Sequence, residues 1–361
     1  MFSKLTQEYY TACLLGGAIG DALGAPIEFM SITQIRNNYG ISGVKAYVEY
    51  PDGTGEFTDD TQMTLFTAEG LLRAWHRAEH KGIGGAMHQI VYESYLRWLH
   101  TQGESIAPGK YNRTMSKSPS DNGWLLRQKE LFKRRAPGNT CLSALKSGLV
   151  GTIEEPINKS KGCGGIMRVA PVGLVFPGKN EFSFQTASEF AAITHGHPSG
   201  YLSAGFFASV ISDLAVGITL VESINNALAI LKNWKRHAET LQAVENALNL
   251  FTEKRSLLSQ EPGKIPEFIE QLGGGWVGEE ALAISLFCSL LYQDNFEKGV
   301  LAAVNHSGDS DSTGSITGNI LGLINGMNSI PEKWITNLRY NNIVRTIGED
   351  LHLSGNILSN N

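Results

Sequence analysis

The chain has 361 residues, of which 42% are hydrophobic and 18% charged, a composition that is typical of a folded globular protein and excludes an intrinsically disordered one. Its formal net charge of -5 excludes the overall basic character of a general nucleic-acid binder. The longest apolar stretch, residues 202–221, is interrupted by Asp213 and does not read as a transmembrane segment. We therefore expect neither nucleic acid nor a membrane as a partner.

Apolar residues recur with the helical period along most of the chain. A short apolar stretch at residues 12–19 predicts a core helix near the N-terminus. Further helices are predicted at residues 65–80, 84–100, 143–151, 199–216, 223–234, 238–255, 279–292 and 315–327. Residues 43–50 are the only modest strand candidate, either as a hairpin arm or as an extended loop. Strands and helices do not alternate, so the predicted fold class is all-α.

Glycines follow a helical spacing in two of these segments, at Gly16, Gly20 and Gly24 and again at Gly314, Gly318, Gly322 and Gly326. A spacing of four places each set on one helix face, where a neighbouring backbone can approach closely. Each helical glycine costs about 1 kcal/mol of helix propensity. Either ordinary close packing or the convergence of helix ends on a site would account for glycines in a helix despite that cost.

No linker divides the chain. The polar loops at residues 102–122 and 260–275 separate no change in composition, so we expect one domain over residues 1–361 with long functional loops. The four cysteines form neither a CxxC pair nor a Cys/His pattern with zinc spacing. Free thiols suit a reducing compartment, and we expect a cytoplasmic protein, with a monomer as the default state.

Two acidic segments precede predicted helices. The first contains Thr58, Asp59 and Asp60; one acid can cap a helix, but adjacent carboxylates repel each other unless a cation lies between them. The second interleaves Asp309 and Asp311 with serines, an array of hard oxygens that suits Mg²⁺, Mn²⁺ or Ca²⁺ without the EF-hand pattern. Together the two segments supply about what a two-metal site needs.

Other segments carry weaker signals. Glu28 follows the first glycine-rich helix and reads as either a surface acid or a site residue, whereas Asp21 lies inside that helix among apolar neighbours. The glycine-rich stretch 159–168 is either a phosphate cradle or a tight turn, and it matches neither a Walker nor a Rossmann motif. We expect a structural ion pair from Arg168. His195 and His197 flank a glycine, and a core histidine is the default interpretation of each.

In their order along the chain, these segments resemble the ADP-ribosylglycohydrolases, a family that includes the dinitrogenase-reductase-activating glycohydrolase and the eukaryotic ADP-ribosylhydrolases. The matching motifs are GDALGAPIE (20–28), FTDDT (57–61), RAPGNT (135–140), GCGGIMR (162–168), THGHPSG (194–200), GGGWVGEEAL (273–282) and GDSDSTG (308–314). The resemblance implies a compact orthogonal helical bundle whose central cleft holds two divalent cations, Mg²⁺ or Mn²⁺.

The family's site residues carry over position by position. The implied metal ligands are Thr58, Asp59, Asp60, Asp309, Asp311 and Ser312, where Ser312 replaces the threonine of many relatives. The implied ADP-ribose contacts are Ser160, Gly162, Cys163, Gly164, Gly165, Ile166, Met167, His195 and Trp276. Cys163 stands in place of the asparagine of some relatives, which changes the side-chain contact at that point. Glu28 matches a glutamate that in some relatives approaches the metals or gates the cleft.

The resemblance implies hydrolysis of the N-glycosidic bond between ADP-ribose and a modified protein, with ADP-ribose as product. The motifs THGHPSG and GDSDSTG are similar to those of the arginine-specific branch. Either Asp60 or Glu28 would transfer the proton, and we favour Asp60. The alternatives are ADP-ribosyl-serine or O-acetyl-ADP-ribose as substrate, a protein that only binds ADP-ribose, or an unrelated two-metal phosphoesterase.

Overall fold

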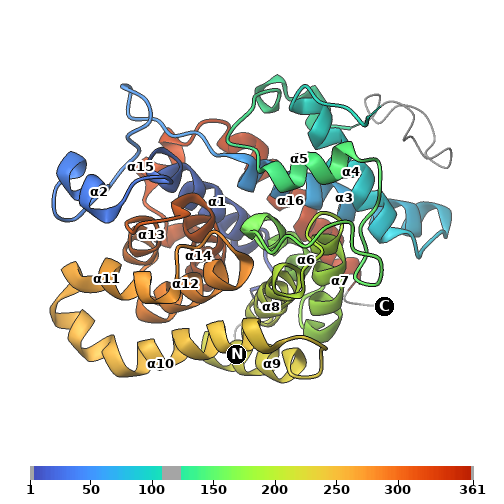
Figure 1. Ribbon diagram of the computed structural model, residues 1–361. Helices are drawn as coiled ribbons and strands as arrows, with labels where there is room; N and C mark the ends of the chain where they lie inside the picture. Colours follow the sequence, from blue (N-terminus) through green and yellow to red (C-terminus); the bar gives the residue numbers. More distant parts are fainter. Residues whose placement is uncertain (1–3, 108–122, 359–361) are drawn as a thin grey trace.

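The computed structural model describes residues 4–107 and 123–358 and confirms the all-α prediction (Figure 1). No strand occurs in these ranges, where only isolated bridges join Gly55 to Leu338 and Gly162 to Val277. Residues 108–122 of the predicted loop 102–122 lie outside the described residues. The predicted loop 260–275 contains the short helix α11.

The α-helices of the described residues are α1 (Gln7–Gly24), α2 (Ile32–Tyr39), α3 (Asp59–Lys81), α4 (Met87–Thr101), α5 (Asn139–Lys146), α6 (Ala170–Val175), α7 (Asn180–Ala192), α8 (Pro198–Ala215), α9 (Leu220–Leu231), α10 (Ala238–Gln260), α11 (Ile265–Ile269), α12 (Gly278–Leu291), α13 (Phe296–Val304), α14 (Ser310–Asn325), α15 (Glu332–Asn337) and α16 (Asn341–Leu358).

One predicted helix needs correction, and one open alternative is decided. The helix predicted at 143–151 is α5, which starts at Asn139 and ends at Lys146 because Gly148 adopts a left-handed φ of 71°. Of the two alternatives for residues 43–50, the structure shows the extended loop and not the hairpin arm. There the Val44 N–H donates to Asn305 Oδ1 at 2.8 Å and the Val44 carbonyl accepts from Asn305 Nδ2 at 3.0 Å, so a side chain takes the place of a partner strand.

The two glycine stripes pack against each other at the centre of the molecule, where α1 and α14 lie side by side (Figure 1). A Cβ added to Gly20 would lie 2.0 Å from the carbonyl oxygen of Gly314, and one added to Gly318 would lie 2.0 Å from that of Gly16. Only glycine allows this separation. Both interpretations of the glycines therefore hold, because this contact also brings the end of α1 to the start of α14.

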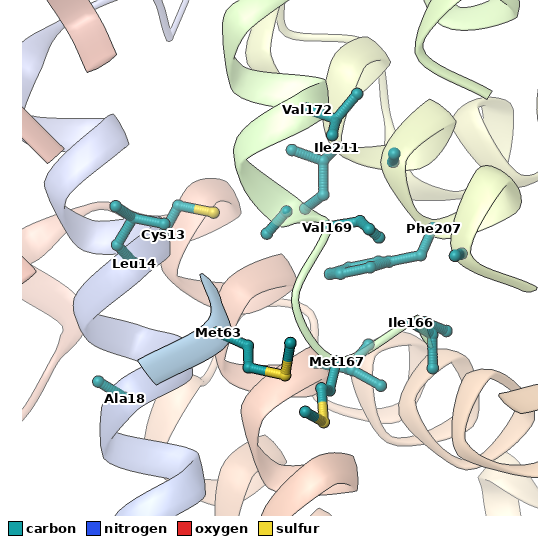
Figure 2. Close-up of a cluster of buried hydrophobic side chains, with 14 of the residues drawn as sticks. Cys13, Leu14, Ala18, Met63, Ile166, Met167, Val169, Val172, Phe207 and Ile211 are labelled. Atoms are coloured by element: carbon teal, nitrogen blue, oxygen red, sulfur yellow. The ribbon is translucent and has the colours of Figure 1, made fainter. Parts of the chain in front are cut away.

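A hydrophobic cluster joins α1 to several other helices (Figure 2). It unites Cys13 and Leu14 of α1 with Met63 of α3 and with Phe207 and Ile211 of α8. The segment 166–169, which follows the glycine-rich stretch, runs through the middle of the cluster. Close packing of these side chains fixes the start of α3 and the glycine-rich stretch relative to α1.

Among the described residues no single helix has both the length and the apolar character needed to cross a bilayer. The bent pair Gln7–Ile27 and Ile32–Tyr39 meets the criterion only when taken together, and its first part includes α1, which is buried from Tyr10 to Gly24.

Candidate functional site

Three helix ends meet at one cleft of about 370 Å³. Helix α3 begins at Asp59, with Thr58 as its N-cap, and α14 begins at Ser310, with Asp309 as its N-cap. The end of α1 touches the start of α14, since a Cβ on Gly24 would lie 2.3 Å from the Ser310 carbonyl. The two acidic segments, distant in sequence, are thus brought to the same place.

Most of the residues expected at a site line this cleft: Glu28, Asp59, Asp60, Gly162, Cys163, Gly164, Met167, His195, Trp276, Asp309, Asp311 and Ser312. The others lie behind its wall. Thr58 is 2% exposed and donates from Oγ1 to Asp311 Oδ2 at 3.4 Å. Ser160 shares a hydrogen bond of 3.1 Å with Thr140, Gly165 is buried, and the Ile166 side chain belongs to the hydrophobic cluster of Figure 2.

Four carboxylates of the cleft are buried without a basic partner. Asp59 is 4% exposed, and Asp60, Asp309 and Asp311 are each 3% exposed. Within the described part of the chain, no ion pair to lysine or arginine reaches any of them. Burying like charges without compensation is strongly unfavourable, so this cluster requires protons or a cation.

The pKa values of these carboxylates are shifted in the direction expected for buried negative charges without a basic partner. Burial is the main cause that raises the pKa values of Asp59, Asp60, Asp309 and Asp311, and the neighbouring carboxylates add to the shift of the first three. Burial and the charge of Asp311 raise the pKa of Glu28 to about 9. A divalent cation in the cluster would reverse all of these shifts.

The donor set fits such a cation. Carboxylate oxygens of Glu28, Asp309 and Asp311 all lie within 4.8 Å of one another. Asp60 Oδ2 is buried and has no hydrogen-bond partner among the described residues, although a buried carboxylate oxygen normally has one. Hard anionic oxygens are the ligands that Mg²⁺ and Mn²⁺ prefer. The residues present therefore suit a divalent cation.

Asp21 orients the acidic end of α3 from behind. It accepts hydrogen bonds from the Thr58 N–H at 2.8 Å, the Thr61 N–H at 3.0 Å and the Thr61 hydroxyl at 2.6 Å. Burial and the charge of Asp311 raise the pKa of Asp21 to about 7, against these hydrogen bonds. The acid inside the first glycine-rich helix thus supports the cluster without lining the cleft.

The glycine-rich stretch forms the opposite wall. Cys163 opens a 3-10 turn that ends at Gly165, and its thiol donates to Asp309 Oδ2 at 2.8 Å. Lys161 turns toward Glu279 and Glu239, which pins the stretch to α12 and α10. The glycines, not the lysine, therefore face the cleft, as an anion-binding loop requires.

Two aromatic rings stand at the mouth of the cleft. Phe29, next to Glu28, is 78% exposed and stacks on Trp276, which is 42% exposed, with ring centroids 5.3 Å apart. The Trp276 loop is fixed by Glu280, which accepts from the Gly274 and Gly275 N–H groups at 3.0 and 3.2 Å. Exposed aromatic rings at a cleft are typical of binding surfaces.

Arg168 differs from its predicted role. It is fully buried, and within the described residues it forms no ion pair; it donates to the Thr194 hydroxyl at 2.6 Å and lies over the Tyr95 ring at 4.3 Å. Thr194 Oγ1 lies 2.8 Å from Nδ1 of His195. The pKa of His195 falls to about 3, because of burial and then the charge of Arg168, so the ring is neutral.

Two parts of the cleft wall had no role predicted from the sequence. One is Phe29, and the other is the segment from Ala136 to Cys141. This segment is tied to α3, since the Gly138 N–H donates to Asp59 Oδ2 at 3.0 Å and the Asp59 N–H donates to the Arg135 carbonyl at 3.0 Å. In the sequence this segment was marked only by the motif at 135–140, and a motif does not indicate which residues it contacts.

Comparison with known proteins agrees with this arrangement. A sequence model of the ADP-ribosylglycohydrolases matches residues 3–358. The chain is 24% identical to ADP-ribosylarginine hydrolase Tri1 of Serratia proteamaculans, covering 94% of this chain and 77% of that protein. It is 23% identical to the ADP-ribosyl-[dinitrogen reductase] glycohydrolase of Rhodospirillum rubrum, covering 90% and 88%.

A solved structure has the same fold. It is described as an ADP-ribosylglycohydrolase-related protein complex and superposes with a TM-score of 0.59 at 20% identity, covering 97% of this chain and 98% of the other. The family match spans nearly the whole chain and includes every acidic residue of the cleft. The protein therefore belongs to the ADP-ribosylglycohydrolase family.

Proposed function

We propose that this protein hydrolyses the N-glycosidic bond between ADP-ribose and an arginine side chain of a modified protein. The observation that carries the proposal is the cluster of four buried carboxylates without counter-charge, on one cleft with the glycine-rich stretch and His195. The arginine linkage is supported by the similarity to a protein named ADP-ribosylarginine hydrolase and by the motifs at 194–200 and 308–314.

Two divalent cations, Mg²⁺ or Mn²⁺, complete the proposed site. Their ligands are Thr58, Asp59, Asp60, Asp309, Asp311 and Ser312. When bound, the cations orient the ribose hydroxyls and lower the pKa of the attacking water. The buried position of the carboxylates keeps bulk water away from the reacting bond and strengthens every charge interaction there.

The remaining roles belong to the chain itself. Cleavage at the anomeric carbon passes through an oxocarbenium-like state, and negative side chains around the ribose stabilise it. We assign proton transfer to Asp60, whose Oδ2 has no competing hydrogen bond among the described residues. Glu28 is the second candidate at the rim. The residues Ser160 and Gly162 to Met167, with His195 and Trp276, are proposed to contact ADP-ribose.

The decisive experiment measures release of free ADP-ribose from an arginine-ADP-ribosylated protein, with Mg²⁺ and then with EDTA, beside a serine-linked substrate and O-acetyl-ADP-ribose. We expect metal-dependent release from the arginine linkage alone. The Asp60→Ala variant should lose about 10²- to 10³-fold in turnover, the usual effect of removing one group that stabilises a transition state.

Each alternative has its own result. Release from serine or from O-acetyl-ADP-ribose alone would keep the family and the site but replace the linkage. Binding of ADP-ribose with no release from any substrate would support the binding-only alternative. Near-native turnover of Asp60→Ala would refute the role assigned to that residue.

A further inference from the structure

Arg168 is a buried cation that the proposed chemistry does not use. It is 0% exposed, carries a guanidinium group, and has no carboxylate partner among the described residues. It donates to the Thr194 hydroxyl at 2.6 Å and the Phe190 carbonyl at 3.3 Å and lies over the Tyr95 ring at 4.3 Å. Its Nη1 reaches only two sulfur atoms among the described residues, those of Met63 at 3.5 Å and Cys141 at 3.7 Å, and its Nε has no partner there. An uncompensated buried charge destabilises a fold by several kcal/mol, so packing alone does not account for it.

The contacts of Arg168 lead directly to His195. A guanidinium only donates hydrogen bonds, so Thr194 Oγ1 accepts from Arg168 and retains its own hydrogen to donate. The nearest good acceptor is Nδ1 of His195 at 2.8 Å. Among the described residues the alternative acceptor for the Thr194 hydrogen is the Cys141 sulfur, which is a weak acceptor, so a proton on Nδ1 would leave that hydrogen poorly paired.

The opposite ring nitrogen faces the glycine-rich wall of the cleft. A Cβ on Gly162 would lie 3.5 Å from Nε2 of His195, and one on Gly164 would lie 3.1 Å from it. At Gly164 the ring therefore leaves no room for an ordinary side chain, while His195 itself lines the cleft. A proton on Nε2 would point to the place where an anionic ligand meets the glycine-rich stretch.

We propose that Arg168 and Thr194 are positioning residues that hold His195 as the neutral tautomer with its proton on Nε2, a hydrogen-bond donor aimed into the cleft at an anionic oxygen of the ligand. The order of donation is Arg168 to Thr194, Thr194 to Nδ1, and Nε2 to the ligand. That the ligand is ADP-ribose rests on the proposed function, whereas the tautomer does not depend on it.

The first test reads the tautomer without a ligand. Long-range ¹H–¹⁵N spectra of histidine-labelled protein distinguish a protonated from an unprotonated ring nitrogen, and the His195→Gln variant assigns the signals by their loss. We expect the proton on Nε2 in the wild type, a mixture of tautomers in Thr194→Val, and a return to Nε2 in Thr194→Ser, which keeps the hydroxyl. A proton on Nδ1 in the wild type overturns the proposal even if Thr194→Val does not fold.

The second test measures ADP-ribose binding by calorimetry in the same proteins. We expect the Kd to rise about tenfold in Thr194→Val and to stay near the wild-type value in Thr194→Ser. Unchanged affinity and an unchanged tautomer in Thr194→Val would refute the relay. If the wild type and Thr194→Val show the expected tautomers but the wild type binds no ADP-ribose, the relay is supported and the proposed function is not.

Discussion

Substituting Gly20 by alanine should separate the two central helices and weaken the site at the same time. The new Cβ would lie 2.0 Å from the Gly314 carbonyl oxygen and 2.3 Å from its carbon, both backbone atoms that no rotamer change can move. An ordinary contact begins at 3.4 Å, so α1 and α14 would have to move apart by about 1.4 Å.

The magnitude follows from two opposing terms. Alanine improves helix propensity by about 1 kcal/mol, and overpacking of this kind costs about 3 kcal/mol, the upper end of the usual range, because backbone meets backbone. The free energy of unfolding should therefore fall by about 2 kcal/mol. Gly20 precedes Asp21, which orients α3, so ADP-ribose release should also fall by about 10²-fold, as a displacement of about 1 Å can cause.

Urea denaturation followed by circular dichroism measures the stability, and the release assay measures the activity. Gly299→Ala in α13 is the matched control, because its Cβ would meet side chains and no backbone: the end of Leu321, Cδ1 at 2.2 Å, and Tyr292 Cβ at an ordinary 3.4 Å. We expect the control to stay within about 1 kcal/mol of the wild type. If Gly20→Ala is as stable as Gly299→Ala and fully active, the glycine contact does not set the distance between these helices.

Three further predictions concern the cleft. Asp21→Asn should lower the free energy of unfolding by about 1–3 kcal/mol in urea titrations, since an amide cannot accept all three hydrogen bonds from Thr58 and Thr61; an unchanged midpoint would contradict this. In EDTA, the raised pKa values of Glu28, about 9, and Asp21, about 7, mean that the folded state holds protons that the unfolded chain releases near pH 4. The contribution of these two groups to the stability of the metal-free protein should therefore be greatest near pH 4 and fall as the pH rises to about 9, which thermal melts would measure. Saturating Mg²⁺ should abolish this dependence on pH. A metal-free protein that grows more stable from about pH 4 to about pH 9 would refute the reasoning. Trp276→Ala should raise the KM for the modified protein with a change in stability below about 0.5 kcal/mol, because the ring is partly exposed; an unchanged KM would remove Trp276 from the binding surface.

Much of the helical framework could be predicted because its signals are local. The apolar period placed α8, α10 and α12 within a few residues of their observed starts. It was less accurate at the site, where α3 and α14 begin at Asp59 and Ser310, several residues before the predicted starts at 65 and 315. The polar first turns of these helices carry no apolar repeat, since their side chains face the cleft and not the core.

The acidic segments were visible in the sequence, but their meeting was not. Adjacent carboxylates indicate an unusual electrostatic environment wherever they fold, and glycines at a spacing of four indicate a close approach to some partner. Neither signal identifies the partner. In the structure α1 packs against α14, and Asp311 at the start of α14 lies beside Thr58. Arg168 shows the same limit, because an arginine in a sequence suggests an ion pair, whereas its buried contacts here are a hydroxyl, a carbonyl, two sulfur atoms and a ring.

The fold class, many of the helices and the residue types that can hold a cation could be predicted from the sequence, because these depend on neighbours within a few positions along the chain. The helices α2, α6, α7, α11, α13, α15 and α16 were not predicted. The tertiary structure alone decided which helix ends converge, which carboxylates lack a counter-charge and which way His195 faces. Those properties depend on contacts between segments far apart in the sequence, such as Gly20 with Gly314, and no local pattern encodes such a pairing.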